Sequence, residues 1–314
     1  MNFRIEKYHA GWQNQWNRCV EAAPGGFFLH NRHYMDYHSE RFEDFSLLIL
    51  QGDELIGCVP AHRTGNRLFS HRGLSFGGWL MRRNYTPEKM REIWRLLLSF
   101  LKENNIDDFQ LTTAPFFYRA YLSAYDDYIF REFGKVEKIA RHWMIDTRKK
   151  QDTLLNADRR RSLKKLPDLR VEDSTEWEVF WPVLEANLKV RHRAVPVHSL
   201  DEIRLLHGRF PRNIRLKIVR SKKEVIGGAV LYDYGQTLHF QYIAVVPDAS
   251  LRPGVDRLVF EIIRENYARY PFIGLGTSET PDGKEESLSY WKYSLGAEPF
   301  PQYSYLFDVA KLDL

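Results

Sequence analysis

The sequence predicts an α/β protein with mixed sheets, built from two copies of one unit. Segments with the two-residue period of strands alternate with segments that have the spacing of amphipathic helices. One order of such segments occurs twice along the chain. Of the 314 residues, 44% are hydrophobic and 14% are aromatic, which is enough for one large core or two ordinary ones.

The clearest strand in the pattern is Leu238 to Val246. If the side chains alternate strictly, Phe240 and Tyr242 share one face and His239 and Gln241 share the other. A helix from Gly254 to Tyr270 follows, because apolar residues recur at helical spacing there; they are Val255, Leu258, Val259, Ile262 and Ile263.

The repeated order begins with a hairpin. Glu54-Leu55-Ile56-Gly57 matches Glu224-Val225-Ile226-Gly227, and each is followed by elements in the same order. These are a strand (68–80 and 238–246), a helix (87–104 and 254–270), a strand (109–113 and 272–276) and a short aromatic helix that ends in glycine (118–134 and 287–296). We therefore expect equivalent units at residues 1–150 and 151–314, with Gly57 and Gly227 at equivalent hairpin positions.

The positive charge of the chain is concentrated near the expected boundary. The net charge is +5, and residues 148–170 hold nine Lys or Arg and three Asp, so this stretch is +6 and the remainder is −1. Such a patch favours a phosphate, a phospholipid surface or RNA as partner, with a solvated linker helix as the alternative. The candidate anion or RNA contacts are Arg160, Arg161, Lys164 and Lys165.

Composition also argues against several classes of protein. The N-terminus lacks the apolar run of a signal peptide, and no stretch has the roughly 18 apolar residues of a membrane span, so we expect a cytoplasmic protein. Cys19 and Cys58 are too few for a disulfide framework or a Cys-rich metal site. His192 and His198 have no carboxylate-rich ligand set beside them, and no metal site is predicted.

Four motifs carry a resemblance to a known family. They are SHRGLSFGGWL (70–80), RHRAVPVHSLDEI (191–203), HFQYIAVVP (239–247) and GLGTSETPDGKEESLSYWKYSLGAEP (274–299). Together with the repeated order, they resemble the GNAT (Gcn5-related N-acetyltransferase) superfamily, whose fold is the acyl-CoA N-acyltransferase fold. Two units in tandem with a basic segment between them resemble the FemAB-like branch of that superfamily.

The resemblance implies an acyl donor between the strands at 238–246 and 272–276, with its phosphates at the helix that follows. The donor would be coenzyme A as acetyl-CoA, and the implied contacts are Val245, Val246, Arg252, Gly254, Val255, Gly276 and Thr277. In the family's phosphate loop, Leu251 stands at the basic position and Asp256 at the second glycine, which departs from the pattern. Aminoacyl-tRNA, the donor of some FemAB-like enzymes, is therefore the alternative.

Acyl transfer to an amine needs a proton acceptor and a donor for the oxyanion. Glu279 and Lys292 follow the strand end that carries the resemblance, and His239 and Tyr242 lie on the neighbouring strand. These four are the candidate catalytic residues. Strict alternation predicts that His239 with Gln241, or Tyr242 with Phe240, reaches the substrate, but not all of them.

The acceptor is implied by the resemblance alone. We expect a small-molecule or lipid-linked amino sugar or peptide from a cell-envelope or polysaccharide precursor, with tRNA and a peripheral membrane contact as further partners. The candidate acceptor contacts are Arg191, His192, His198, Gln241, His71, Tyr34 and Tyr37. The alternatives to an acetyltransferase are an aminoacyl-tRNA-dependent aminoacyltransferase and a non-catalytic module that binds a glycan or a lipid-linked precursor.

Overall fold

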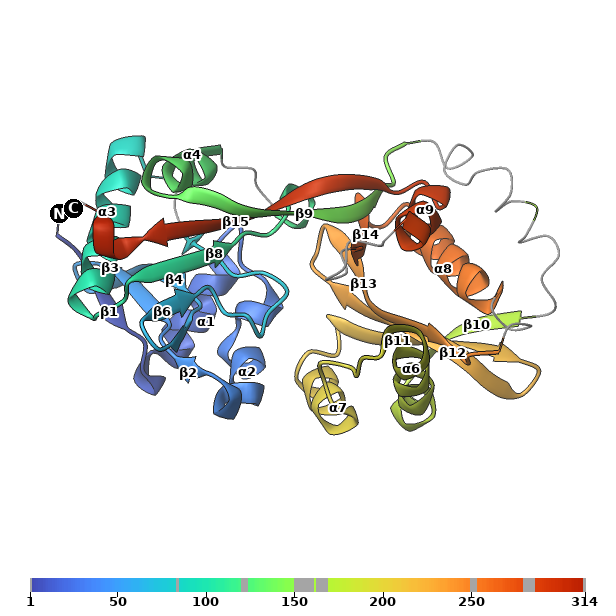
Figure 1. Ribbon diagram of the computed structural model, residues 1–314. Coiled ribbons are helices and arrows are strands. Elements are labelled where there is room, and N and C mark those ends of the chain that lie inside the picture. Colours follow the sequence, from blue (N-terminus) through green and yellow to red (C-terminus); the bar gives the residue numbers. More distant parts are fainter. Residues whose placement is uncertain are drawn as a thin grey trace. The chain divides into compact units, whose positions relative to one another are not determined.

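The computed structural model divides the chain into two compact units (Figure 1). It describes residues 2–82, 85–119, 124–149, 161, 169–248, 253–278 and 286–312. Unit 1 contains Met1–Ala140 and Pro301–Leu314, and unit 2 contains Arg141–Phe300. Each unit has its own sheet strands and its own hydrophobic core.

The first sheet of unit 1 is antiparallel, in the order β1 (Phe3–Lys7), β3 (Leu47–Gln51), β4 (Glu54–Val59) and β7 (Leu80–Met81). Helices α1 (Gln13–Ala22) and α3 (Pro87–Glu103) bury apolar residues against alternate residues of these strands. Helix α3 begins as sequence rules predict, because Thr86 accepts a hydrogen bond from Lys89 N and proline occupies the first turn.

The remaining strands of unit 1 lie around β8 (Asp108–Thr112). β8 pairs in parallel with β6 (Arg67–Phe69) and antiparallel with the end of β15 (Glu298–Asp308), while β5 (His62–Thr64) links β6 to β2 (Glu43–Asp44). The short helices are α2 (Arg32–Met35) and α4 (Ala124–Phe133), with 3-10 turns η1 (Ala10–Trp12), η2 (Phe28–His30), η3 (Asp36–Arg41), η4 (Phe116–Tyr118) and η7 (Val309–Lys311).

The sheet of unit 2 has the order β10 (Leu169–Ser174), β11 (Ile214–Ser221), β12 (Glu224–Asp233), β13 (Thr237–Val245), β14 (Phe272–Thr277) and the end of β9 (Lys135–Asp146). Neighbours are antiparallel except for β13 and β14, which are parallel. Helices α6 (Trp177–His192) and α7 (Leu200–Arg209) cover one face, and α8 (Pro253–Asn266) and α9 (Glu286–Ser294) cover the other (Figure 1).

The predicted equivalence of the two hairpins is confirmed. In β3–β4, Ile49 pairs with Gly57 and the register then shifts; in β11–β12, Val219 pairs with Gly227 and the register shifts at the same step. The one-residue bulges therefore fall at Ile56 and Ile226. An extra side chain would not fit at either glycine, because a Cβ would lie 2.9 Å from Leu80 O at Gly57 and 2.4 Å from Ala244 O at Gly227.

The division into units differs from the predicted boundary near residue 150, because two strands pass from one unit to the other along the chain. Residues 142–146 of β9 pair with β14 in unit 2, and residues 304–308 of β15 pair with β8 in unit 1. Tyr305, Phe307 and Val309 are buried in the core of unit 1. Each unit is thus completed by a strand from the far side of the predicted boundary.

The predicted single strand over residues 68–80 is wrong. The chain forms β6, then a loop at 70–79, then β7. The loop contains Gly73, Gly77 and Gly78 and a non-glycine residue in the left-handed region, His71 with φ 58°. Such a segment is typical of a loop rather than a strand.

Candidate functional site

The two parallel strands of unit 2 part from each other after the first three residues of each strand. Thr237–His239 pairs with Phe272–Gly274, and among the described residues this pairing goes no further. β13 then has a bulge at Gln241, since Val230 pairs with Tyr242 and Leu231 with Phe240. The β14 register with β9 also shifts, between Gly274 and Gly276. Within the described ranges, the β13 edge beyond His239 therefore has no neighbouring strand on the β14 side.

The bulge at Gln241 corrects the predicted faces of β13. Phe240 packs into the core with α8, and so does Ile243, which a strict alternation would place on the opposite face. The extra residue changes the parity of the strand. His239 and Tyr242 consequently share the face opposite α8, where Tyr242 contacts Trp181 of α6 at a ring distance of 5.7 Å.

His239 is buried in the part of the strand just before the gap. Its ring lies 5.8 Å from that of His142 and 6.2 Å from that of Tyr234, and its Cε1 faces Gly276. Burial, together with the positive charge of Lys292, lowers the pKa of His239 to about 4. The imidazole is neutral near pH 7, and in this state it is a weak base.

Lys292 lies at the same strand end, as predicted, but with a defined structural partner. Its side chain is buried, and Nζ donates to the carbonyls of Gly276 at 3.1 Å and Thr277 at 2.7 Å. Gly276 has φ 70°, a conformation suited to glycine. The ammonium group of Lys292, which lies in α9, thereby holds the C-terminal end of β14 beside His239.

Tyr242 and His198 form a second polar pair on the face of β13 opposite α8. His198 Nδ1 lies 2.8 Å from the Tyr242 hydroxyl, and both side chains are mostly buried. Burial raises the pKa of Tyr242, so that the phenol stays protonated. A protonated phenol beside an imidazole can donate a proton and be reprotonated.

Several predicted residues lie outside the described part of the chain. These are Glu279, Arg252, Arg160, Lys164 and Lys165, and the side chains of Arg191 and His192. Arg161 is exposed. Ser278, the last described residue before Glu279, is buried, and among the described residues its hydroxyl has no hydrogen-bond partner.

The start of α8 is packed against the hairpin of unit 2. A Cβ on Gly254 would lie 3.2 Å from Ile226 Cδ1, so this glycine permits close packing. The Asp256 carboxylate is buried and accepts a hydrogen bond from Trp291 Nε1 at 3.0 Å. Asp256 thus links α8 to α9. Val245 and Val246 belong to the adjoining strand end, where Val245 O accepts from Asn187 at 2.7 Å and Val246 N donates to Ile226 O.

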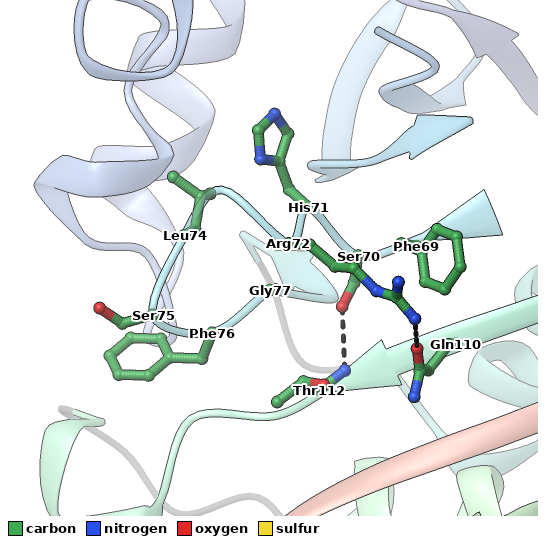
Figure 2. Close-up of a pocket in the computed structure, with 10 residues that line it drawn as sticks. All are labelled: Phe69, Ser70, His71, Arg72, Leu74, Ser75, Phe76, Gly77, Gln110 and Thr112. Carbon is green, nitrogen blue, oxygen red and sulfur yellow. Dashed lines mark hydrogen bonds between the residues drawn. The ribbon is translucent and has the colours of Figure 1, made fainter. Parts of the chain in front are cut away.

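Unit 1 contains a cavity of about 200 Å³ at the loop between β6 and β7. It is lined by Phe69, Ser70, His71, Arg72, Leu74, Ser75, Phe76, Gly77, Gln110 and Thr112. Figure 2 shows that Ser70 and Arg72 reach β8: Ser70 Oγ accepts from Thr112 N at 2.9 Å, and Arg72 Nη2 donates to Gln110 Oε1 at 3.0 Å. The Arg72 guanidinium also stacks on Phe69, 3.6 Å from the ring centre.

This loop occupies the place in unit 1 that corresponds to the open strand edge of unit 2. Phe69 pairs with Gln110 as His239 pairs with Gly274, and Leu80 pairs with Cys58 as Ala244 pairs with Gly228. Between these points unit 1 has residues 70–79, whereas unit 2 has only 240–243. Gly77 N donates to Thr112 O, so the loop itself pairs with β8.

Among the first-unit candidates, the structure places His71 at the cavity and not the two tyrosines. The His71 ring packs near those of His38 and His62 at 5.1 and 5.4 Å, and burial lowers its pKa to about 3. Tyr34 is buried against Phe28 and Tyr37. Acceptor binding by Tyr34 and Tyr37 stays a prediction.

Sequence reasoning missed Asn187 and Ser278. Asn187 is one of several polar residues in α6, and no spacing rule connects its amide with the Val245 carbonyl. Ser278 stands next to the predicted Glu279, and a buried hydroxyl at a strand end is visible only in three dimensions. In the described part of the chain, no cluster of His, Cys, Asp or Glu could hold a metal ion, and no helix is long and apolar enough to cross a membrane.

Comparison with known proteins agrees with this arrangement. Residues 156–275 match the family model of the acetyltransferase (GNAT) domain. That segment contains β13, α8 and β14 up to Leu275, the elements around the strand gap. The match supports the expected enzyme class, an acyltransferase. No curated protein sequence matches the chain.

Solved structures resemble the chain over nearly its whole length. FemX has a TM-score of 0.68 at 10% identity, with 98% of each chain covered. The C-terminal domain of a putative lysylphosphatidylglycerol synthetase from Agrobacterium fabrum has a TM-score of 0.61 at 11% identity. The match covers 94% of this chain and 92% of that one. A tandem GNAT protein from the clavulanic acid biosynthesis pathway has a TM-score of 0.53 at 12% identity, with 99% of each chain covered. Residues 156–275 therefore match a GNAT acetyltransferase domain, and the fold of the whole chain is similar to those of FemX and of a tandem GNAT protein.

Proposed function

We propose that unit 2 transfers an acyl group from acyl-coenzyme A to an amine on a cell-envelope or polysaccharide precursor. The observation that carries this proposal is the parting of β13 from β14 beyond His239, with a bulge at Gln241. An open strand edge can pair with the amide groups of an extended ligand arm. The arm of coenzyme A contains such amides.

The bulge at Gln241 can also stabilise the negative charge that develops on the carbonyl oxygen during the reaction. A bulged residue does not join the ladder in the regular way, so its N–H can point toward a ligand. In acyl transfer to an amine, nitrogen attacks the thioester carbon and the carbonyl oxygen becomes negative. A fixed backbone N–H at Gln241 or Tyr242 would stabilise that oxygen.

The proton transfers can then be assigned to individual side chains. The C–N bond forms, the C–S bond breaks, the amine loses a proton and the leaving thiolate takes one. We assign protonation of the thiolate to Tyr242, which stays protonated because burial raises its pKa, and His198 at 2.8 Å can restore its proton. Glu279 is the proposed acceptor of the amine proton. Lys292 holds the strand end where the thioester would lie, and His239 lies beside it.

A second donor has specific support. The stretch from 148 to 170 has a charge of +6, and the Asp256 carboxylate lies at the start of α8, where a coenzyme pyrophosphate would otherwise bind. Aminoacyl-tRNA would use a basic surface and would not need that helix start. The fold likeness to FemX and to a lysylphosphatidylglycerol synthetase domain favours an envelope acceptor with either donor.

The test is a thermal shift of the full chain with coenzyme A esters in one arm and aminoacyl-tRNA in the other, followed by mass spectrometry of amine acceptors. A ligand at 100 times its dissociation constant stabilises a protein by about 2.7 kcal/mol. We expect stabilisation by acyl-coenzyme A and a mass gain of one acyl group on the acceptor. Stabilisation by neither donor, with binding of a glycan or lipid-linked precursor, would leave a non-catalytic binding module.

A further inference from the structure

The connection between α6 and α7 exposes three aliphatic side chains. Val190 is 66% exposed, Val195 81% and Val197 67%. Valine is among the residues most often buried in folded proteins, and a group of exposed apolar side chains marks an interaction surface. We call residues 189–199 the valine loop.

The backbone of the valine loop has defined contacts where it leaves α6. Helix α6 ends at His192, its C-cap Arg193 has a left-handed φ of 50°, and Ala194 N donates to Leu188 O. Val195 and Val197 flank Pro196, which is half-buried and restricts the chain. The two exposed valines are therefore separated by one residue of restricted conformation.

The far end of the valine loop is anchored beside the proposed reaction site. His198 is buried and its Nδ1 is 2.8 Å from the Tyr242 hydroxyl of β13. Ser199 then caps α7, accepting from Glu202 N, and Glu202 in turn accepts from Ser199 N. The exposed valines are therefore part of a firmly held structure.

The charge around the valines indicates what covers them. From residue 189 to residue 200 the sequence has three Lys or Arg and no Asp or Glu, and Lys189 and Arg193 are exposed. The nearest carboxylates along the chain are Glu185 of α6 and, in the first turn of α7, Asp201 and Glu202, of which Glu202 accepts from Ser199 N. Apolar side chains flanked by cations are typical of segments that enter the interface of an anionic bilayer, where each basic residue adds attraction to the lipid headgroups. A second copy of this chain would bring the same positive charges together.

We propose that the valine loop docks on an anionic membrane surface, with Val190, Val195 and Val197 among the lipids and Lys189 and Arg193 at the headgroups. Docking would hold the His198–Tyr242 pair close to the bilayer, where a lipid-linked acceptor is found. This inference deepens the proposed function. Only the suggested purpose of docking, access to a lipid-linked acceptor, rests on that function. Membrane binding itself requires no acyl donor.

The experiment is flotation of the full chain with vesicles of phosphatidylcholine alone or mixed equally with phosphatidylglycerol. We expect binding to the anionic vesicles. The variant Val190→Ser, Val195→Ser, Val197→Ser should bind at least about tenfold more weakly, because three exposed apolar side chains are lost. Lys189→Gln with Arg193→Gln should weaken binding about fivefold for each charge removed. Leu96→Ser with Ile139→Ser, which changes exposed aliphatic residues of unit 1, is the matched control and should bind like the wild type.

Circular dichroism and the thermal shift with donor check that the variants are folded and that the reaction site is intact. A donor-induced shift that persists in the valine variant while flotation is lost would separate membrane docking from donor binding. No flotation of the wild type with anionic vesicles, or equal flotation of the valine variant, would overturn the inference. So would a wild-type dimer that the valine variant loses, because the loop would then be an interface between copies.

Discussion

At the scale of single residues, Lys292 acts through the backbone it holds. Its ammonium group donates to the carbonyls of Gly276 and Thr277 at the end of β14, where Gly276 has a left-handed φ. The resemblance predicts a catalytic role for Lys292, whereas its hydrogen bonds to the strand end support a positioning role. These contacts could come only from the structure, because no sequence pattern shows which carbonyls a lysine on a helix will reach.

We predict that Lys292→Met lowers the free energy of unfolding by roughly 2 kcal/mol, because two charge-assisted hydrogen bonds are lost. Binding of the acyl donor should weaken about tenfold as the strand end becomes less ordered. Urea unfolding and calorimetric titration measure the two effects. Lys223→Met, which changes an exposed hairpin lysine, is the control; equal donor affinity in both variants would show that Lys292 does not position the site.

His30 gives the stability of unit 1 a pH dependence of known sign. The ring is fully buried, its Nδ1 accepts from Phe27 N at 3.3 Å, and its Nε2 lies 3.2 Å from Phe76 O in the cavity loop. These contacts suit the neutral ring with the proton on Nε2. Burial lowers the pKa of His30 from 6.5 to about 4.

The unfolded state consequently binds the His30 proton more readily between pH 6.5 and 4. Stability is fully present above pH 6.5 and falls as the pH drops toward 4. At pH 5 the loss from His30 is roughly 2 kcal/mol relative to pH 7.5. Burial also lowers the pKa of His71 and His239, while the raised pKa of Asp126, about 6, opposes them.

Urea unfolding at pH 7.5, 6 and 5 tests this prediction. His30→Gln should show a smaller loss of stability on acidification than the wild type, because glutamine can make both hydrogen bonds and does not titrate. His9→Gln, at a surface histidine, should retain the wild-type pH dependence. Identical pH dependence in the wild type and His30→Gln would contradict the assignment.

At the scale of elements, the paired hairpins show what a sequence pattern can and cannot predict. The matched Glu-aliphatic-Ile-Gly segments predicted equivalent hairpins, and both have their bulge before the glycine. The bulge at Gln241 was not predictable in this way. It depends on how β13 pairs with β12, and it moved Tyr242 to the face of His239. The repeated order of elements likewise predicts a strand at 68–80, and it does not reveal the glycine-rich loop at 70–79.

Gly57→Ala and Gly227→Ala should each destabilise the protein by about 1 to 3 kcal/mol, since the new methyl group would press on backbone atoms of the adjacent strand. Gly208→Ala is the matched control: this helical glycine of α7 has nothing within 4 Å of an added Cβ. It should be stabilising by about 0.5 to 1 kcal/mol. Thermal and urea unfolding measure all three variants. A marked difference in sign between Gly57→Ala and Gly227→Ala would contradict the equivalence of the hairpins.

At the scale of the whole molecule, the C-terminal strand returns to unit 1 and completes its sheet and its core. Residues 304–308 pair with β8, and Tyr305 and Phe307 are buried in the core of unit 1. No periodicity in the sequence reveals this return, because a final strand reads the same whichever sheet it joins. The predicted boundary at residue 150 followed from assigning each strand to its neighbours in sequence.

Truncation after Phe300 should therefore unfold unit 1 and leave unit 2 folded. Hydrogen exchange read by mass spectrometry should show loss of protection at β1, β3 and β8 and retained protection at β11 and β12. A circular permutant that begins at Pro301, with Leu314 joined to Met1 by a flexible linker of about 20 residues, should recover protection in unit 1. Full protection of β8 in the truncated chain would show that the C-terminal strand is dispensable.

The central claim is that the acyl donor binds in unit 2 and not in unit 1. In unit 1 the loop at 70–79 pairs with β8 and occupies the place that corresponds to the open β13 edge. Hydrogen exchange of the full chain with and without acetyl-coenzyme A, and with aminoacyl-tRNA in a second arm, tests it most directly. The account predicts new protection at residues 240–246 of the β13 edge and at 274–278 of the β14 end, and unchanged exchange at 69–77 and 110–112. Protection by donor at the unit 1 cavity in place of the β13 edge, or no protection by either donor, would contradict it.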